Sequence, residues 1–146
     1  MKRYLLILLV LAFSYAASSC GKEATPSPTS VSVVEDQASL LIGLQSAGAT
    51  AEITDTVTQD FFTPEGSIIT VNGQDIQVFE YESAEAMENE ASQVAPDGGS
   101  VGTSMMMWMD APHFYKTGRI IALYIGSDKT ILALLEKVIG SQFAGR

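Results

Sequence analysis

The sequence predicts an α+β fold: a single two-layer domain with a mainly antiparallel sheet and helices packed on one face. Three segments carry apolar residues at helical spacing, and the segments between them have the composition and alternation of strands. Short turns separate most of these strands, and short turns join antiparallel neighbours, whereas parallel neighbours need a longer crossover. The expected order of elements is α-β-β-β-α-β-β-β-α.

The first predicted elements are a helix and a strand. Ser32 and Glu35 have the spacing of a capping box, and Gly48 suits the end of a helix. Between them, apolar residues recur at helical intervals: Leu40, Leu41, Leu44 and Ala47. Residues 49–57 then alternate small or apolar side chains with polar ones, which is typical of a half-buried strand. We expect residues 61–62 to continue this strand.

A hairpin is predicted next. Asn72-Gly73 lies between two apolar runs, and this pair favours a type I′ turn because both central residues then adopt positive φ. The turn predicts the register: Val71 opposite Gln74, Ile69 opposite Ile76, and Ser67 opposite Val78. One face of the hairpin therefore receives Ile69, Val71, Ile76 and Val78. Phe79 and Tyr81 point to the other face, which predicts a hairpin covered on both sides.

The second half of the chain repeats this pattern. Ser83 is the expected N-cap of a helix that ends before Gly98-Gly99. Its apolar stripe is Ala84, Met87, Ala91 and Val94. Three strands are predicted after it, at residues 103–109, 113–116 and 119–125.

The last strand and the last helix have the clearest patterns. Residues 120–125 are apolar at every position, which predicts a central strand with neither face open to water. Asp128 then begins a helix that ends at Gly140. Its apolar residues fall at i, i+3, i+4, i+7 and i+8: Ile131, Leu134, Leu135, Val138 and Ile139.

The N-terminal segment has the layout of a secretory signal. Lys2 and Arg3 precede an apolar run over residues 4–13, and small residues over 14–19 lead to Cys20. The run is about ten residues long, whereas a permanent membrane-spanning helix needs roughly 20. We therefore expect a signal peptide that is removed from the mature protein.

The end of this leader resembles the lipobox of bacterial lipoproteins. Ala17-Ser18-Ser19 places small residues before Cys20, the position that this family acylates, although the family more often has leucine where Ala17 stands. The resemblance implies lipidation of Cys20 and an extracytoplasmic site in the cell envelope, at the outer membrane if the cell has two membranes. Ala17 and Ser19 also satisfy the small-x-small rule of ordinary signal cleavage. A secreted protein with a free thiol is therefore the alternative.

These features predict three regions. Residues 1–19 are the cleaved signal peptide, residues 20–31 hold the lipidated Cys20 and a flexible Thr/Ser/Pro tether, and residues 32–146 form the single α+β domain. Cys20 is the only cysteine, so we expect neither disulfides nor thiolate metal ligands in the domain.

Charge narrows the classes of partner. Without the leader, the chain has 6 basic and 17 acidic side chains, a net charge of −11. No Lys or Arg occurs between Lys22 and Lys116. Nucleic acid is therefore excluded as a partner, because binding it needs a basic surface. The expected partners are the membrane, through the lipid, and another envelope protein or a small ligand.

The most unusual constellation is Met105-Met106-Met107-Trp108-Met109, followed by His113. On a strand, alternate residues share a face. A soft-metal site for Cu(I) or Ag(I) could then use three thioethers and one imidazole: Met105, Met107, Met109 and His113. The other interpretation is that these methionines fill a core beneath a helix.

No catalytic motif accompanies these residues. His113 has Asp110 nearby, but the sequence lacks a Gly-x-Ser-x-Gly elbow and a second histidine, so a small hydrolase is only a further alternative. We expect a binding module that is not an enzyme and has no cofactor. Its expected contact surface is the aromatic segment at the Pro112 break: Trp108, His113, Phe114 and Tyr115. The alternative for these rings is that they close the core.

Overall fold

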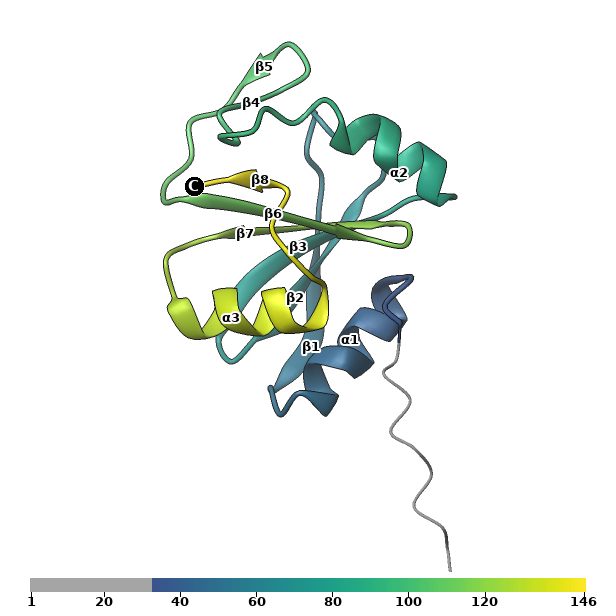
Figure 1. Ribbon diagram of the computed structural model, residues 1–146, viewed down its shortest axis with the longest axis vertical. Helices are drawn as coiled ribbons and strands as arrows, with labels where there is room; N and C mark the ends of the chain where they lie inside the picture. The colour runs from purple at the N-terminus through teal and green to yellow at the C-terminus, as the bar shows by residue number, and fades with distance from the viewer. Residues whose placement is uncertain (1–32) are drawn as a thin grey trace, which may run out of the picture. The chain divides into compact units, whose positions relative to one another are not determined.

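A six-stranded antiparallel sheet organises the domain, in the order β1-β2-β3-β7-β6-β8 (Figure 1). The computed structural model describes residues 33–146; the predicted signal peptide, Cys20 and the predicted tether lie outside the described residues. The helices are α1 (Gln37–Ser46), α2 (Ala84–Ala91) and α3 (Lys129–Val138). The strands are β1 (Ala51–Val57), β2 (Gly66–Val71), β3 (Gln74–Glu80), β4 (Ser100–Val101), β5 (Ser104–Met105), β6 (Pro112–Thr117), β7 (Ile120–Ile125) and β8 (Ala144–Gly145). The predicted α+β class is confirmed.

The predicted hairpin is confirmed with its register. Asn72 and Gly73 both have positive φ, at 49° and 82°, as a type I′ turn requires. All three predicted pairs occur between β2 and β3: Val71 with Gln74, Ile69 with Ile76, and Ser67 with Val78. The predicted central strand is also confirmed, because β7 lies between β3 and β6 and its first five residues are buried.

The sheet separates two apolar cores. On one face, α1 and α3 bury Leu40, Leu44, Ile131 and Leu135 against Ile69, Val71, Ile76 and Val78. On the other face, α2 buries Met87 and Ala91 against Phe79, Ile121 and Leu123. Figure 1 shows the sheet between α2 and the pair formed by α1 and α3. The prediction of two layers with all helices on one face is therefore wrong for α2. Strand β7 is apolar on both faces, and β3 adds Phe79 to the face that α2 covers, so both faces of the sheet need a cover.

Helix α1 begins four residues later than expected. Its N-cap is Asp36, whose Oδ1 accepts a hydrogen bond from the Ser39 backbone N–H at 2.9 Å. Ser39 Oγ accepts from the Asp36 N–H at 3.0 Å, which completes a capping box. The Ser39 hydroxyl also donates to Asp36 Oδ1, at 2.7 Å. This hydrogen bond and that from the Ser39 N–H, followed by the charge of the Arg119 guanidinium, lower the pKa of the Asp36 carboxyl. Of the pair expected to form the cap, Ser32 lies outside the described residues, and Glu35 precedes the observed N-cap.

Two strand predictions need correction. Residues 61–62 do not extend β1, because the Phe62 ring packs on Phe79 at 4.8 Å between centroids and the chain turns there. Strand 103–109 shrinks to the two residues of β5, and residues 106–111 have no regular structure. In β1, a bulge between Ile53 and Asp55 accompanies an edge strand that is mostly exposed rather than half-buried.

Candidate functional site: the methionine loop

Residues 105–109, which we term the methionine loop, lead from the β4–β5 hairpin towards β6 (Figure 1). Backbone pairing holds the start of this loop: Ser100 pairs with Met105, and the Met106 N–H donates to the Gly99 carbonyl at 2.9 Å. Trp108 Nε1 donates to the Gly98 carbonyl at 2.6 Å. The loop is therefore fixed to residues 98–100 at both of its ends.

The Trp108 side chain attaches the loop to the core that α2 covers. Its ring lies 6.0 Å from the Phe114 ring and 6.0 Å from the Phe61 ring, in edge-on contacts. Phe114 is fully buried, whereas Trp108 is half-buried. Trp108 thus positions the methionines on either side of it, because edge-on aromatic pairs stabilise a defined arrangement.

Three methionines of this loop point into solvent. Relative to the free residue, the exposed fractions of Met105, Met107 and Met109 are 89%, 100% and 103%. Met87, on α2, is 5% exposed. The interpretation of the three methionines as core filler is therefore wrong. Because these side chains lie at the surface, each can serve as apolar contact area for a partner or as a thioether ligand for a metal.

A pocket of about 300 Å³ lies beside the exposed methionines. Its lining is Met106, Trp108, Asp110, Ala111, Pro112 and Arg146. Asp110 Oδ1 accepts from the Ala111 N–H at 2.7 Å, and its Oδ2 is 3.4 Å from Ser127 Oγ. Sequence reasoning missed Arg146 in this site. The pairing of the chain's end with β6, through the Arg146 N–H and the Pro112 carbonyl at 3.1 Å, leaves no signal in the local sequence.

The expected contact surface of four aromatic residues does not form. His113, Phe114 and Tyr115 are buried, with exposed fractions of 6%, 0% and 3%, and only Trp108 reaches the surface. Both faces of the sheet are covered at β6, so Tyr115 enters the core under α1 and α3, and Phe114 enters the core under α2. The alternative interpretation, in which these rings close the core, is the correct one for the three residues of β6.

His113 is also separated from the methionines. Its ring stacks on Tyr124, at 6.1 Å between centroids, and Tyr124 belongs to the core beneath α1 and α3. Trp108, which holds the methionine loop, packs on the other core. The four-ligand set of Met105, Met107, Met109 and His113 is therefore not assembled, because the sheet lies between the imidazole and the loop. His113 and Asp110, the two residues of the hydrolase alternative, have other partners. His113 Nδ1 is hydrogen-bonded to Gln142 Oε1 at 2.6 Å, and Asp110 Oδ1 accepts from the Ala111 N–H.

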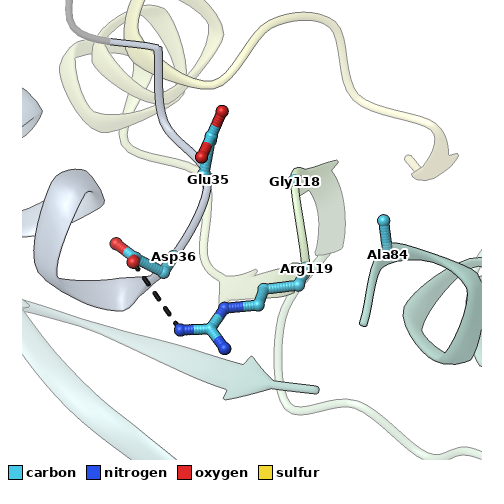
Figure 2. Close-up of a pocket in the computed structure, with 5 residues that line it drawn as sticks. All are labelled: Glu35, Asp36, Ala84, Gly118 and Arg119. Carbon is cyan, nitrogen blue, oxygen red and sulfur yellow. Dashed lines mark ion pairs between the residues drawn. The ribbon is translucent and has the colours of Figure 1, made fainter. Parts of the chain in front are cut away.

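Two other pockets are structural in character. One has a volume of about 400 Å³ and is lined by Glu35, Asp36, Ala84, Gly118 and Arg119. Figure 2 shows these five residues. Arg119 Nη2 lies 2.7 Å from Glu80 Oε1 and 3.6 Å from Asp36 Oδ2, so two carboxylates already neutralise the guanidinium. An anionic ligand would have to compete with both carboxylates. These residues join the start of the domain to the β6–β7 turn.

The other pocket, also of about 400 Å³, contains Tyr81 and Glu90. Tyr81 Oη donates to Glu90 Oε2 at 2.9 Å, and the Thr63 N–H donates to the same oxygen at 3.1 Å. Burial raises the pKa of the Tyr81 hydroxyl, and the hydrogen bond to Glu90 and its negative charge raise it further. Tyr81 therefore stays protonated and donates to Glu90, and the same carboxylate joins the 61–64 turn to α2 through the Thr63 N–H.

Among residues 33–146, no cluster of three or more His, Cys, Asp or Glu side chains could hold a metal ion. In the same part of the chain, no helix has the length and apolar character needed to cross a bilayer. No protein-family model, curated protein or solved structure matches the chain.

Proposed function

We propose that this chain is a bacterial envelope lipoprotein, anchored through Cys20, whose domain binds another envelope protein through the methionine loop. One observation carries the binding role: three methionine side chains of a single loop are almost fully exposed. Exposed apolar side chains gathered at one place mark interaction sites. The leader and the resemblance of residues 17–20 to a lipobox support the anchor.

The energetics of the loop suit a protein partner. Burying one methionine side chain contributes about 1.5–3 kcal/mol, so three such side chains supply a useful part of a binding free energy. Unbranched methionine side chains also adapt to partners of different shape. Attachment to the same membrane surface raises the effective concentration of two anchored proteins, so they can associate through a contact of modest affinity.

The chemistry of the partner follows from charge. The mature chain carries a net charge of −11, and Asp110 lines the pocket beside the loop. The partner we infer offers an apolar segment flanked by basic residues, because complementary charge steers association and rejects acidic proteins. The same acidic charge repels anionic lipid headgroups, so direct contact of the loop with such a membrane surface is disfavoured.

The anchor is testable by mass. We expect the mature protein to begin at Cys20 and to carry diacylglycerol on the Cys20 thiol, because the residues before it match lipoprotein processing. Mass spectrometry of the N-terminal peptide from native membranes measures this directly. A Cys20→Ser variant is the control. It should either keep its leader uncleaved or no longer associate with the membrane. An unmodified Cys20 thiol in a soluble mature protein contradicts the anchor.

The contact is testable by photo-crosslinking in native membranes. A photoreactive residue at position 107 should capture one defined partner, because the Met107 side chain is fully exposed. The matched control places the same residue at position 42, where Ile42 is an exposed apolar residue on α1. Substituting glutamine at positions 105, 107 and 109 should weaken capture from a separate photoreactive site at position 103. Equal capture from positions 42 and 107 contradicts the proposal.

A soft-metal role is the second candidate, and the exposure of three thioethers at alternate positions favours it. We expect Cu(I) to bind and to raise the melting temperature, since a ligand that binds only the folded state stabilises it. Met107→Leu should abolish binding, whereas Met87→Leu, which changes a buried methionine, should not. A Cu(I) titration followed by thermal denaturation measures both. A flat titration of the reduced protein removes this candidate.

A further inference from the structure

The oxidisable sulfur of the domain is concentrated in one loop. The chain has six methionines, of which Met1 belongs to the predicted leader and Met87 is buried under α2. The other four all lie in the methionine loop, and three of them are almost fully exposed. Every methionine of residues 33–146 that is openly accessible to a dissolved oxidant therefore sits within five residues.

Methionine at these positions has a property that leucine lacks. The two side chains offer similar apolar area, but a thioether is oxidised to a polar sulfoxide, and exposure controls its rate. A surface selected only for apolar contact could use leucine, which resists oxidation. Methionine at these three exposed positions therefore combines apolar contact area with a group that can be oxidised.

We propose that Met105, Met107 and Met109 form an oxidative modification site, at which a peroxide-class oxidant converts each thioether to a sulfoxide. The reaction balances with hydrogen peroxide alone: the O–O bond breaks, an S–O bond forms, and the second oxygen leaves with both hydrogens as water. The sulfur loses two electrons and the peroxide gains them. As a regulatory device this rests on the proposed binding function, because three polar sulfoxides remove the apolar contact surface of the loop.

The fold tolerates this modification. The three thioethers lie in solvent, and the loop is held instead by the Met106 and Trp108 hydrogen bonds and by the contact of Trp108 with Phe114. Oxidation of Met87 would differ, because it would place a polar sulfoxide in the core that α2 covers. Burial protects this methionine in the folded protein.

Peptide mass spectrometry of the full chain, treated with hydrogen peroxide over time, tests the modification. Oxidation of positions 105, 107 and 109 should be on the order of ten-fold faster than that of Met87 in the folded protein, and similar to it in denaturant. The melting temperature should stay unchanged once the three positions are oxidised. Oxidation of the loop no faster than that of Met87, or a melting temperature that falls with loop oxidation, would overturn the proposal.

Retention on a phenyl matrix tests the regulatory part separately, measured on residues 20–146 with Cys20→Ser so that no lipid binds the matrix. The reduced protein should be retained, peroxide should abolish retention, and a variant with leucine at positions 105, 107 and 109 should be retained before and after peroxide. A variant with glutamine at positions 105, 107 and 109 separates this outcome from failure of the proposed function. If the glutamine variant is retained as strongly as the reduced protein, the loop is not the apolar contact surface and the proposed function fails. The mapped modification then still stands. If the glutamine variant is not retained but the oxidised protein is, the switch is overturned.

Discussion

Replacing Gly118 with alanine is expected to lower the free energy of unfolding by about 3 kcal/mol. Gly118 follows β6 with φ of +52°, a region that favours glycine. A Cβ atom there would lie 2.3 Å from the Glu35 carbonyl oxygen and 2.4 Å from the Glu35 Cα. Both are backbone atoms, so the clash cannot be relieved by a side-chain rotation.

The expected loss of stability is large because Gly118 lies between two residues that bind the start of the domain. Thr117 Oγ1 donates to the Val34 carbonyl at 2.9 Å, and the Arg119 N–H donates to the Glu35 carbonyl at 2.9 Å. Figure 2 shows Asp36 and Arg119, which form the ion pair beside them. An alanine at 118 must push residues 34–36 away and so weaken all of these contacts together.

Urea denaturation measures this effect, and Gly73→Ala is the matched control. Gly73 also has positive φ, at +82°, but a Cβ atom there meets nothing within 4 Å. Gly73→Ala should therefore cost about 1 kcal/mol, from backbone strain without a clash. Equal losses in the two variants would show that the approach of Glu35 to Gly118 carries no energetic weight.

The sequence predicts those parts of the fold that depend on local chemistry. Asn72-Gly73 determines its turn through backbone sterics, and the period of two along each strand then determines the register. The side of the sheet that a helix covers is a different matter. Periodicity identifies the apolar face of α2, with Met87 and Ala91, but not which face of the sheet that stripe meets. The all-apolar β7 indicates only that both faces need covers.

The sequence predicts where the candidate site lies but not how its residues are arranged. Methionine at alternate positions fits a strand, and a strand with one apolar face normally buries that face. Trp108 contacts the Gly98 carbonyl, Phe114 and the Phe61 ring, which is distant in the sequence. These contacts hold residues 106–109 outside the sheet, and the alternation of methionines contains no trace of them. His113 is placed by alternation along β6, which sends it to the opposite face from Phe114.

Replacing Phe114 with alanine is expected to cost about 3–5 kcal/mol, because it leaves a large cavity in the core under α2. Phe114 has no exposed surface, and its ring lies within 6.5 Å of the rings of Phe62, Trp108 and Phe143. The Trp108 ring loses its support in this variant. We therefore expect a lower unfolding midpoint together with stronger acrylamide quenching of Trp108 fluorescence in the folded protein.

Two further variants separate support of the loop from general loss of stability. Phe143→Ala removes a partly buried ring that packs on Phe114, and no ring contact joins Phe143 to Trp108; it should destabilise the domain less and leave Trp108 quenching unchanged. Phe114→Leu, which conserves most of the volume, should cost about 1 kcal/mol and keep the protein folded if alanine does not. Because leucine cannot reproduce the edge-on contact, quenching of Trp108 should still rise. Quenching that stays at the wild-type level in folded Phe114→Leu would mean that the Gly98 carbonyl alone holds Trp108 and, with it, the methionine loop.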